Sequence, residues 1–312
     1  TKGVAVSYEQ DRYYPAGSLA AHTLGFLGYD SEGRRAGQYG VESFYNEQLF
    51  GQSPDTRSLF ESVKIFDMLH GLIARVTGKA SSESDTSTSE PDIPADIVLT
   101  IDRNVQTYIE GRADNLIKSW SPSGVTIIVQ EPTTGKIVAM VTRPTFDPNT
   151  YRSSEPRLFL NSAVQEIFEP GSSFKSMTMA MGLDTAKITP QTTYTDPGIV
   201  NIAGYDIGNY ARQAHGVKTM TEVLEKSLNT GTMFVQDLIG SDDFLNYTIN
   251  MGFGQNTGID LPGEIAGDIT NLYSGRKINF MTASFGQGIA VTPLQLINAY
   301  SAIAHGGKLM RP

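Results

Sequence analysis

The chain has 312 residues, enough for about two domains, and its 39% apolar residues are ordinary for a globular protein. Its net charge of −9, without a Lys/Arg cluster, argues against binding to nucleic acids and to anionic membrane surfaces. The lack of cysteine excludes disulfides and thiol chemistry, and no apolar run approaches the ~18–20 residues of a membrane-spanning helix.

Composition predicts a domain boundary before residue 95. Residues 59–76 carry apolar side chains at helical spacing, which predicts a helix near the end of a first domain. Residues 81–90 are all Ser, Thr, Asp or Glu, a composition typical of a solvated, flexible linker. We therefore predict a small N-terminal domain over residues 1–78, a linker over 79–94 and a second domain over 95–312.

The second domain is predicted to begin with a strand, a long helix and a hairpin. Residues 97–101 suit a short strand, and Asp102 suits the N-cap of the helix that follows. Trp120, at the end of that helix, is predicted to pack against the core. Two β-branched runs, 124–130 and 136–142, are joined by a Gly-containing loop and predict a β-hairpin.

Residues 169–175, Glu-Pro-Gly-Ser-Ser-Phe-Lys, contain a candidate nucleophile. Ser172 and Lys175 are three positions apart at the predicted start of a buried helix, so their side chains share one face. A serine needs a base to take its proton, and a lysine serves if burial lowers its pKa from ~10.4 towards ~7–8. Backbone N–H groups at the helix start would favour a developing oxyanion.

The pattern Ser-x-x-Lys is short, and a second copy occurs at Ser274 and Lys277. Polar residues and a glycine surround this second copy, and no apolar helix is expected behind it. We therefore interpret Ser274 and Lys277 as part of a surface turn. The copy at Ser172 and Lys175 is the better candidate because a run of apolar residues follows it.

Ser227 and Asn229 form a second polar pair, at the end of a predicted amphipathic helix over residues 221–228. Serine and asparagine are well suited to turns and helix caps, which is one interpretation of the pair. In the other interpretation, the pair points a hydroxyl and an amide at a neighbouring site. Ser227 would then relay a proton between Lys175 and a leaving group, and Asn229 would hold a peptide carbonyl.

A late helix is predicted over residues 293–304, with Tyr300 in the core. The histidines are isolated, and neither a Gly-x-Ser-x-Gly elbow nor a P-loop occurs, so a zinc hydrolase, an α/β-hydrolase and a P-loop enzyme lose their main support. His215, between the two polar pairs, is expected in a surface loop.

Ser172 with Lys175 and Ser227 with Asn229 resemble the first two active-site motifs of the penicillin-binding proteins, whose three signatures are Ser-x-x-Lys, Ser-x-Asn and Lys-Thr-Gly. Other segments are similar to the class B, monofunctional transpeptidase branch: residues 97–106, 169–175, 256–264 and 286–295. Segments within residues 13–51 are similar to the pedestal that precedes the transpeptidase domain in that branch. The similarity covers nearly the whole chain apart from roughly residues 78–94.

The resemblance implies an α/β chain of the α+β type, with a small pedestal domain followed by a transpeptidase domain in which helices cover an antiparallel sheet. No Lys-Thr-Gly triplet occurs in the chain. Either this motif follows on a strand after Pro312 or it has been lost, and the first is favoured because residues 308–312 resemble the middle of a domain. The resemblance also implies that the family's membrane anchor precedes Thr1. Residues 1–312 alone are therefore not expected to catalyse efficiently.

The function that the resemblance implies is a serine D,D-transpeptidase of the bacterial cell wall, without a metal or organic cofactor. Ser172 would be the nucleophile, Lys175 its base and Ser227 a proton shuttle, while Asn229 would orient the substrate. The expected partners are peptidoglycan stem peptides, β-lactams and membrane proteins of the division or elongation machinery, at the extracytoplasmic face of the membrane.

Two alternatives stay open. A non-catalytic interaction module of wall assembly would use the pedestal to bind partner proteins. A β-lactam hydrolase or sensor would share the Ser-x-x-Lys chemistry but would not need the first 80 or so residues, so it ranks lower.

Overall fold

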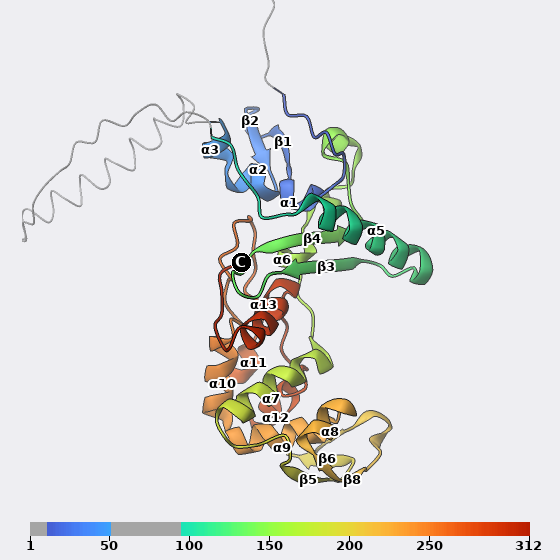
Figure 1. The fold of residues 1–312 in the computed structure, drawn as a ribbon, viewed down its shortest axis with the longest axis vertical. Coiled ribbons are helices and arrows are strands. Elements are labelled where there is room, and N and C mark those ends of the chain that lie inside the picture. The colour runs from blue at the N-terminus through green and yellow to red at the C-terminus, as the bar shows by residue number, and fades with distance from the viewer. Residues whose placement is uncertain (1–10, 51–94) are drawn as a thin grey trace, which may run out of the picture.

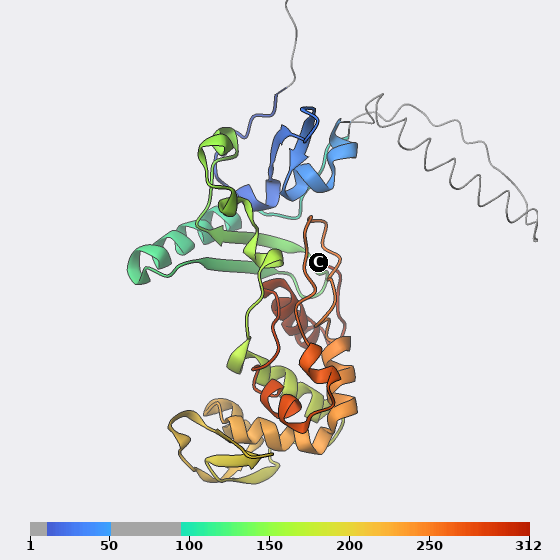
Figure 2. The same cartoon turned by 180° about the vertical axis from the view of Figure 1, so that it is seen from behind.

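The computed structural model describes residues 11–50 and 95–312. The chain forms an elongated molecule, with N-terminal elements at one end, a two-stranded sheet in the middle, and a helical body with two smaller two-stranded sheets at the other end (Figures 1 and 2). The predicted helix over 59–76 and linker over 79–94 lie outside the described residues. No helix of the described part of the chain is both long and apolar enough to cross a membrane.

The N-terminal end consists of short elements around an aromatic core. They are α1 (Ala21–Leu24), the antiparallel pair β1 (Phe26–Tyr29) and β2 (Arg35–Gln38), α2 (Gly40–Phe44) and α3 (Asn46–Phe50). Phe26 stacks on Tyr151 with ring centroids 4.1 Å apart, and packs edge-on against Phe146 and Phe159. The core at this end therefore combines residues from both sides of the predicted linker.

The partners of Phe26 lie in and beside two 3-10 turns, η1 (Pro148–Ser153) and η2 (Pro156–Phe159). Both views place this segment beside β1 (Figures 1 and 2). A buried charged network adds to the connection. Arg143 lies 3.0 Å from Glu110, and Glu110 also accepts a 2.8 Å hydrogen bond from the main-chain N–H of Ala20. A buried carboxylate is costly unless it is paired, so these contacts hold Ala20 and Arg143 together.

The middle of the molecule is an antiparallel hairpin of β3 (Val125–Gln130) and β4 (Ile137–Arg143), as predicted. One side of it contacts α5 (Arg103–Trp120), and the other side contacts α6 (Ser162–Gln165) and α13 (Pro293–Ala304) (Figure 1). Both long helices begin at side-chain caps. Asp102 accepts from the N–H groups of Asn104 and Val105, and Thr292 forms a capping box with Gln295.

Two predictions for this region are wrong. Residues 97–101 form no strand, because only isolated hydrogen bonds, such as Thr100 Oγ1 to the carbonyl of Ile137 at 2.7 Å, connect this stretch to β4. Trp120 is 79% exposed. The buried face of α5 is instead formed by Gln106, Glu110 and Ala113, where Gln106 bonds to both main-chain polar groups of Met140.

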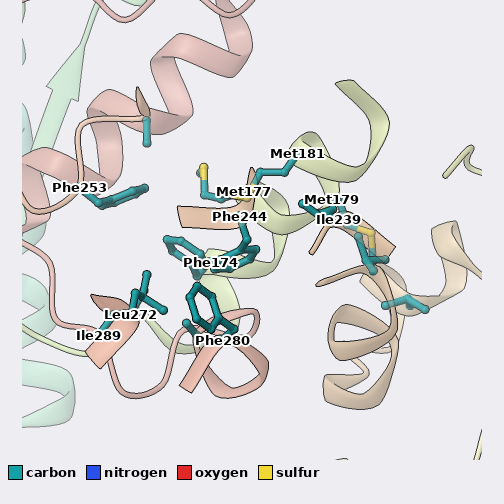
Figure 3. Close-up of a cluster of buried hydrophobic side chains, with 14 of the residues drawn as sticks. Phe174, Met177, Met179, Met181, Ile239, Phe244, Phe253, Leu272, Phe280 and Ile289 are labelled. Atoms are coloured by element: carbon teal, nitrogen blue, oxygen red, sulfur yellow. The ribbon is translucent and has the colours of Figure 1, made fainter. Parts of the chain in front are cut away.

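The helical body surrounds the largest apolar core of the described residues. Its helices are α7 (Lys175–Asp184), α8 (Met220–Glu225), α9 (Asn229–Ile239), α10 (Ser241–Asn250), α11 (Thr270–Tyr273) and α12 (Lys277–Ala283). Phe174, Phe244 and Phe280 are buried at its centre, and Met177 and Met181 of α7 pack beside them (Figure 3). Phe174 is thus anchored in the core directly beside Lys175.

Two small two-stranded antiparallel sheets, which the sequence did not indicate, lie at the far end against α8 and α9. One pairs β5 (Thr193–Asp196) with β8 (Gly216–Thr219), and the other pairs β6 (Ile199–Ile202) with β7 (Tyr205–Gly208). The short 3-10 turn η4 (Tyr210–Arg212) connects β7 to β8. The architecture as a whole is the mixed α+β fold that was predicted.

Candidate active site

Ser172 lies in a 3-10 turn, η3 (Gly171–Phe174), that continues directly into α7 at Lys175. Gly171 begins the turn with φ of 54°, a left-handed conformation that glycine adopts without steric cost. Phe174 is fully buried, so the turn is fixed from the core side. The predicted helix start is therefore present, but its first turn is the tighter 3-10 form.

Lys175 is 2% exposed, and its Nζ donates two hydrogen bonds to one residue: 2.6 Å to the carbonyl of Ser227 and 2.9 Å to the Ser227 hydroxyl. It pairs with no carboxylate among residues 11–50 and 95–312. Burial lowers the pKa of Lys175 to about 8, because the charged form loses its hydration. The N-terminal position in α7 disfavours the same charge.

Ser227 connects the lysine to the candidate nucleophile. Its hydroxyl donates a 3.1 Å hydrogen bond to Ser172 Oγ. No direct hydrogen bond between Ser172 and Lys175 is found among the described residues. The i, i+3 spacing brings both side chains to one face of the helix start, where the Ser227 hydroxyl bonds to each of them. Ser227 has φ of 53°, a left-handed conformation that is unfavourable for serine and that turns both its carbonyl and its hydroxyl toward Nζ.

The helix before the pair ends at Glu225, three residues earlier than predicted, so Ser227 lies in the short connection after α8. Asn229 is not in a loop but is the first residue of α9. The Asn229 side chain donates to the carbonyl of Gly208 at 2.8 Å. This bond uses one of its two amide hydrogens. Leu228, between the two polar residues, is buried, which fixes the connection against the core.

Three long-range contacts hold the turn that carries Ser172, and sequence reasoning missed them all. The N–H of Gly171 donates to the carbonyl of Gly286 at 3.0 Å, and the N–H of Gly288 donates to the Glu169 carboxylate at 2.8 Å. Tyr300 on α13 donates to the carbonyl of Ser173 at 2.7 Å. Tyr300 is 37% exposed, so its predicted place in the core is wrong.

The second Ser-x-x-Lys copy, Ser274 and Lys277, has different hydrogen-bond and ion-pair partners from Ser172 and Lys175. Ser274 donates to the carbonyl of Asn271, and Lys277 forms an exposed 2.6 Å ion pair with Asp237. Our expectation that no apolar helix follows was wrong, because α12 begins at Lys277 and buries Phe280. The pair nevertheless lacks the burial and the serine partner of Lys175.

His215 lies in the loop before β8, as expected, but its side chain is not isolated there. Its Nδ1 lies 2.8 Å from the buried carboxylate of Asp196. Within residues 11–50 and 95–312, no group of three or more His, Cys, Asp or Glu side chains is placed to hold a metal ion.

Two family models match the chain. A model described as penicillin binding protein transpeptidase domain matches residues 125–312, and one described as penicillin-binding protein dimerisation domain matches residues 1–62.

Curated relatives align along nearly the whole chain. Stage V sporulation protein D of Bacillus subtilis is 35% identical over 313 residues, which are 100% of this chain and 46% of the relative. Peptidoglycan D,D-transpeptidase FtsI of Escherichia coli K12 is 28% identical over 311 residues, 99% of this chain and 49% of the relative. The chain thus spans about half the length of the curated relatives it matches.

A solved penicillin binding protein structure also matches the fold of this chain. Penicillin binding protein 3 from Mycobacterium tuberculosis, in a complex with aztreonam, superposes with a TM-score of 0.76 at 27% sequence identity. The match covers 95% of this chain and 58% of that structure.

Proposed function

This chain belongs to the penicillin-binding proteins, in their class B branch, and from that membership we propose that the protein is a peptidoglycan D,D-transpeptidase that acts through a serine acyl-enzyme. The observation that carries the proposal is the hydrogen-bonded chain from buried Lys175 through Ser227 to Ser172. It supplies a nucleophile, a relay and a base with a pKa of about 8.

In the proposed acylation, Ser172 Oγ attacks the carbonyl carbon of the penultimate D-Ala of a stem peptide. In the structure Lys175 Nζ donates to the Ser227 hydroxyl and that hydroxyl donates to Ser172, so both hydroxyls must first rotate. The Ser172 proton then passes to the Ser227 hydroxyl, whose own proton passes to neutral Lys175. The main-chain N–H of Ser172 in η3 favours the oxyanion, whereas the N–H groups of Gly171, Ser173 and Lys175 already bond to main-chain carbonyls. Collapse of the tetrahedral intermediate breaks the peptide bond, and the leaving amine of the terminal D-Ala takes a proton back through Ser227.

An amine of a second stem peptide then attacks the ester, forms the cross-link and returns Ser172 to its starting state. Asn229 keeps one amide hydrogen free of the Gly208 carbonyl and would donate it to a substrate peptide carbonyl. β-Lactams would acylate Ser172 in the same way and leave an ester that hydrolyses slowly.

The substrate places the protein at the extracytoplasmic face of the bacterial membrane, where the wall is assembled. Membrane proteins of the division or elongation machinery are the partners that we propose there. The residue ranges 1–78, 79–94 and 95–312 remain our proposed division into pedestal, linker and transpeptidase domain.

The test is covalent labelling of the natural full-length protein with a fluorescent penicillin, followed by mass spectrometry. We expect one penicilloyl adduct that Ser172→Ala abolishes. Ser274→Ala, in the second Ser-x-x-Lys copy, is the matched control and should be labelled like the wild type. Absence of an adduct, or an adduct that survives Ser172→Ala, would refute the proposal.

A further inference from the structure

A buried carboxylate lies at the end of β5, outside the motifs described above. The Asp196 side chain is fully buried, yet no Lys or Arg of the described residues pairs with it. Its oxygens accept from the Thr230 hydroxyl at 2.6 Å, the Asn209 amide at 2.9 Å, and the main-chain N–H groups of Gly198 and His215 at 3.0 Å. The His215 ring lies 2.8 Å away.

The donors come from separate segments, which distinguishes Asp196 from a carboxylate that only caps its own turn. The bond to Gly198 closes a local turn. The bonds to Asn209 and Thr230 instead join the loop after β7 to the first turn of α9. Burial alone would raise the pKa of Asp196, but the donors, led by Thr230, outweigh it and hold the pKa below its usual value.

The network reaches the Ser227–Asn229 motif from two directions. Thr230 directly follows Asn229, and its N–H donates to Asn209 Oδ1 at 3.2 Å. Gly208, which precedes Asn209, accepts the hydrogen bond of the Asn229 side chain at 2.8 Å. Asp196 therefore fixes both the residue after Asn229 and the residue after its acceptor.

A carboxylate suits this place because it only accepts hydrogen bonds and accepts several at once. A neutral amide of the same size would present a donor to the Thr230 hydroxyl or to the Asn209 amide and would break part of the set. The orientation of a side chain that binds substrate must be held within fractions of an ångström, and small displacements reduce rates by up to ~10²-fold.

We propose that Asp196 is a positioning residue for the Ser227–Asn229 motif, acting through Thr230 and Asn209 to aim the Asn229 amide at the substrate. This inference rests on the proposed function, since it concerns the same site. Asp196 itself touches no reacting atom.

The test compares the acylation of Ser172 by a fluorescent penicillin in full-length variants, with binding and acylation constants measured separately. Asp196→Asn and Thr230→Val should each lower the second-order acylation constant by about 10- to 100-fold. Thr230→Ser retains the hydroxyl and should restore it to within about threefold of wild type. Thr248→Val is the matched control, because its buried hydroxyl bonds to the Phe244 carbonyl at 2.8 Å on α10, away from the motif.

If Thr230 only stabilised the fold, Thr230→Val would slow acylation equally with and without the Asn229 side chain. A double-mutant cycle with Asn229→Ala therefore decides between the two roles. In an Asn229→Ala background, Thr230→Val should change acylation by less than about threefold, because the residue it positions is gone. Thermal unfolding will show whether Asp196→Asn folds. If it does not, the comparison of Thr230→Val with Thr230→Ser and with Thr248→Val still tests the positioning role.

The outcomes separate the two claims. A wild-type protein that is not labelled at Ser172 refutes the proposed function. Two results would overturn the positioning role alone, provided that the wild type is labelled at Ser172. One is normal acylation in Asp196→Asn and Thr230→Val, and the other is an additive loss when Thr230→Val is combined with Asn229→Ala.

Discussion

The hydroxyl of Tyr300 donates a 2.7 Å hydrogen bond to the main-chain carbonyl of Ser173. This bond joins α13, which packs on the central hairpin, to the 3-10 turn of the candidate nucleophile. The turn is therefore held by the core through Phe174 and from the surface through Tyr300, and its geometry depends on a helix that begins more than a hundred residues later.

Tyr300→Phe removes this hydrogen bond and the longer 3.3 Å contact of the same hydroxyl with Ser176 Oγ. We expect acylation of Ser172 to slow by about 2- to 10-fold, which corresponds to the ~0.5–1.5 kcal/mol of one net hydrogen bond. Stopped-flow acylation with a fluorescent penicillin measures the change. Tyr273→Phe, which changes an exposed tyrosine of α11, serves as the control and should acylate at the wild-type rate. An unaltered rate in Tyr300→Phe would show that the hydroxyl does not position the turn.

Gly286→Ala should disturb the same turn from the other side. A Cβ at residue 286 would lie 2.2 Å from the carbonyl oxygen of Gly171, so the backbone before Ser172 must shift. We expect acylation to fall by at least roughly tenfold.

Gly275→Ala is the matched control for this change. Both glycines have left-handed φ, 77° and 68°, and both variants incur the same strain of about 1–2 kcal/mol, but a Cβ at residue 275 meets nothing within 4 Å. Equal acylation losses in the two variants would mean that backbone strain, and not displacement of Gly171, causes the effect.

Lys175→Met keeps an unbranched, buried side chain but removes the base. Loss of a general base lowers rates by about 10²- to 10⁴-fold, and we expect Ser172 acylation to fall within that range. Lys277→Met is a demanding control because it alters the lysine of the other Ser-x-x-Lys copy, and it should have no effect. A small loss in Lys175→Met would indicate that another group takes the proton.

The pH profile of acylation should follow the neutral form of Lys175. Its pKa of about 8 means that the rate rises about tenfold per pH unit below 8 and levels off above it. Rates measured between about pH 6 and pH 9.5 would establish this. A flat profile across that range would exclude Lys175 as the base.

Folding stability provides an independent check on the same pKa. The unfolded lysine titrates near 10.5 and the folded one near 8, so the unfolded state binds more protons between these values. The cost of burying the ammonium is therefore fully present below about pH 8 and is relieved as pH rises towards 10.5. Wild type should gain stability over Lys175→Met across this window, measured by denaturant unfolding. A constant difference would contradict a lowered pKa.

Sequence reasoning found the residues whose chemistry is local. The spacing of Ser172 and Lys175 placed both at a helix start, and the turn tendency of serine and asparagine indicated the break after α8 at Ser227, although Asn229 already belongs to α9. It also found the hairpin around the 131–135 loop, because alternating β-branched residues and a glycine turn encode it within a few positions.

The missed features depend on partners distant in the chain. Nothing near Asp196 or Glu169 indicates that Thr230 and Gly288 will supply their donors. The error at Trp120 has a related cause. A glutamine and a glutamate occupy the buried face of α5 instead, because Met140 and Arg143 supply their hydrogen-bond partners.

The aromatic core around Phe26 limits which segments can be exchanged between related proteins in a functional chimaera. Phe26 packs against Tyr151 and Phe159, so a chimaera that replaces residues 11–50 alone would set foreign side chains against 146–159. Mismatched packing of this kind costs about 1–3 kcal/mol per site. The unit that recombination must transfer intact is therefore discontinuous: residues 11–50 together with the segment that carries η1 and η2.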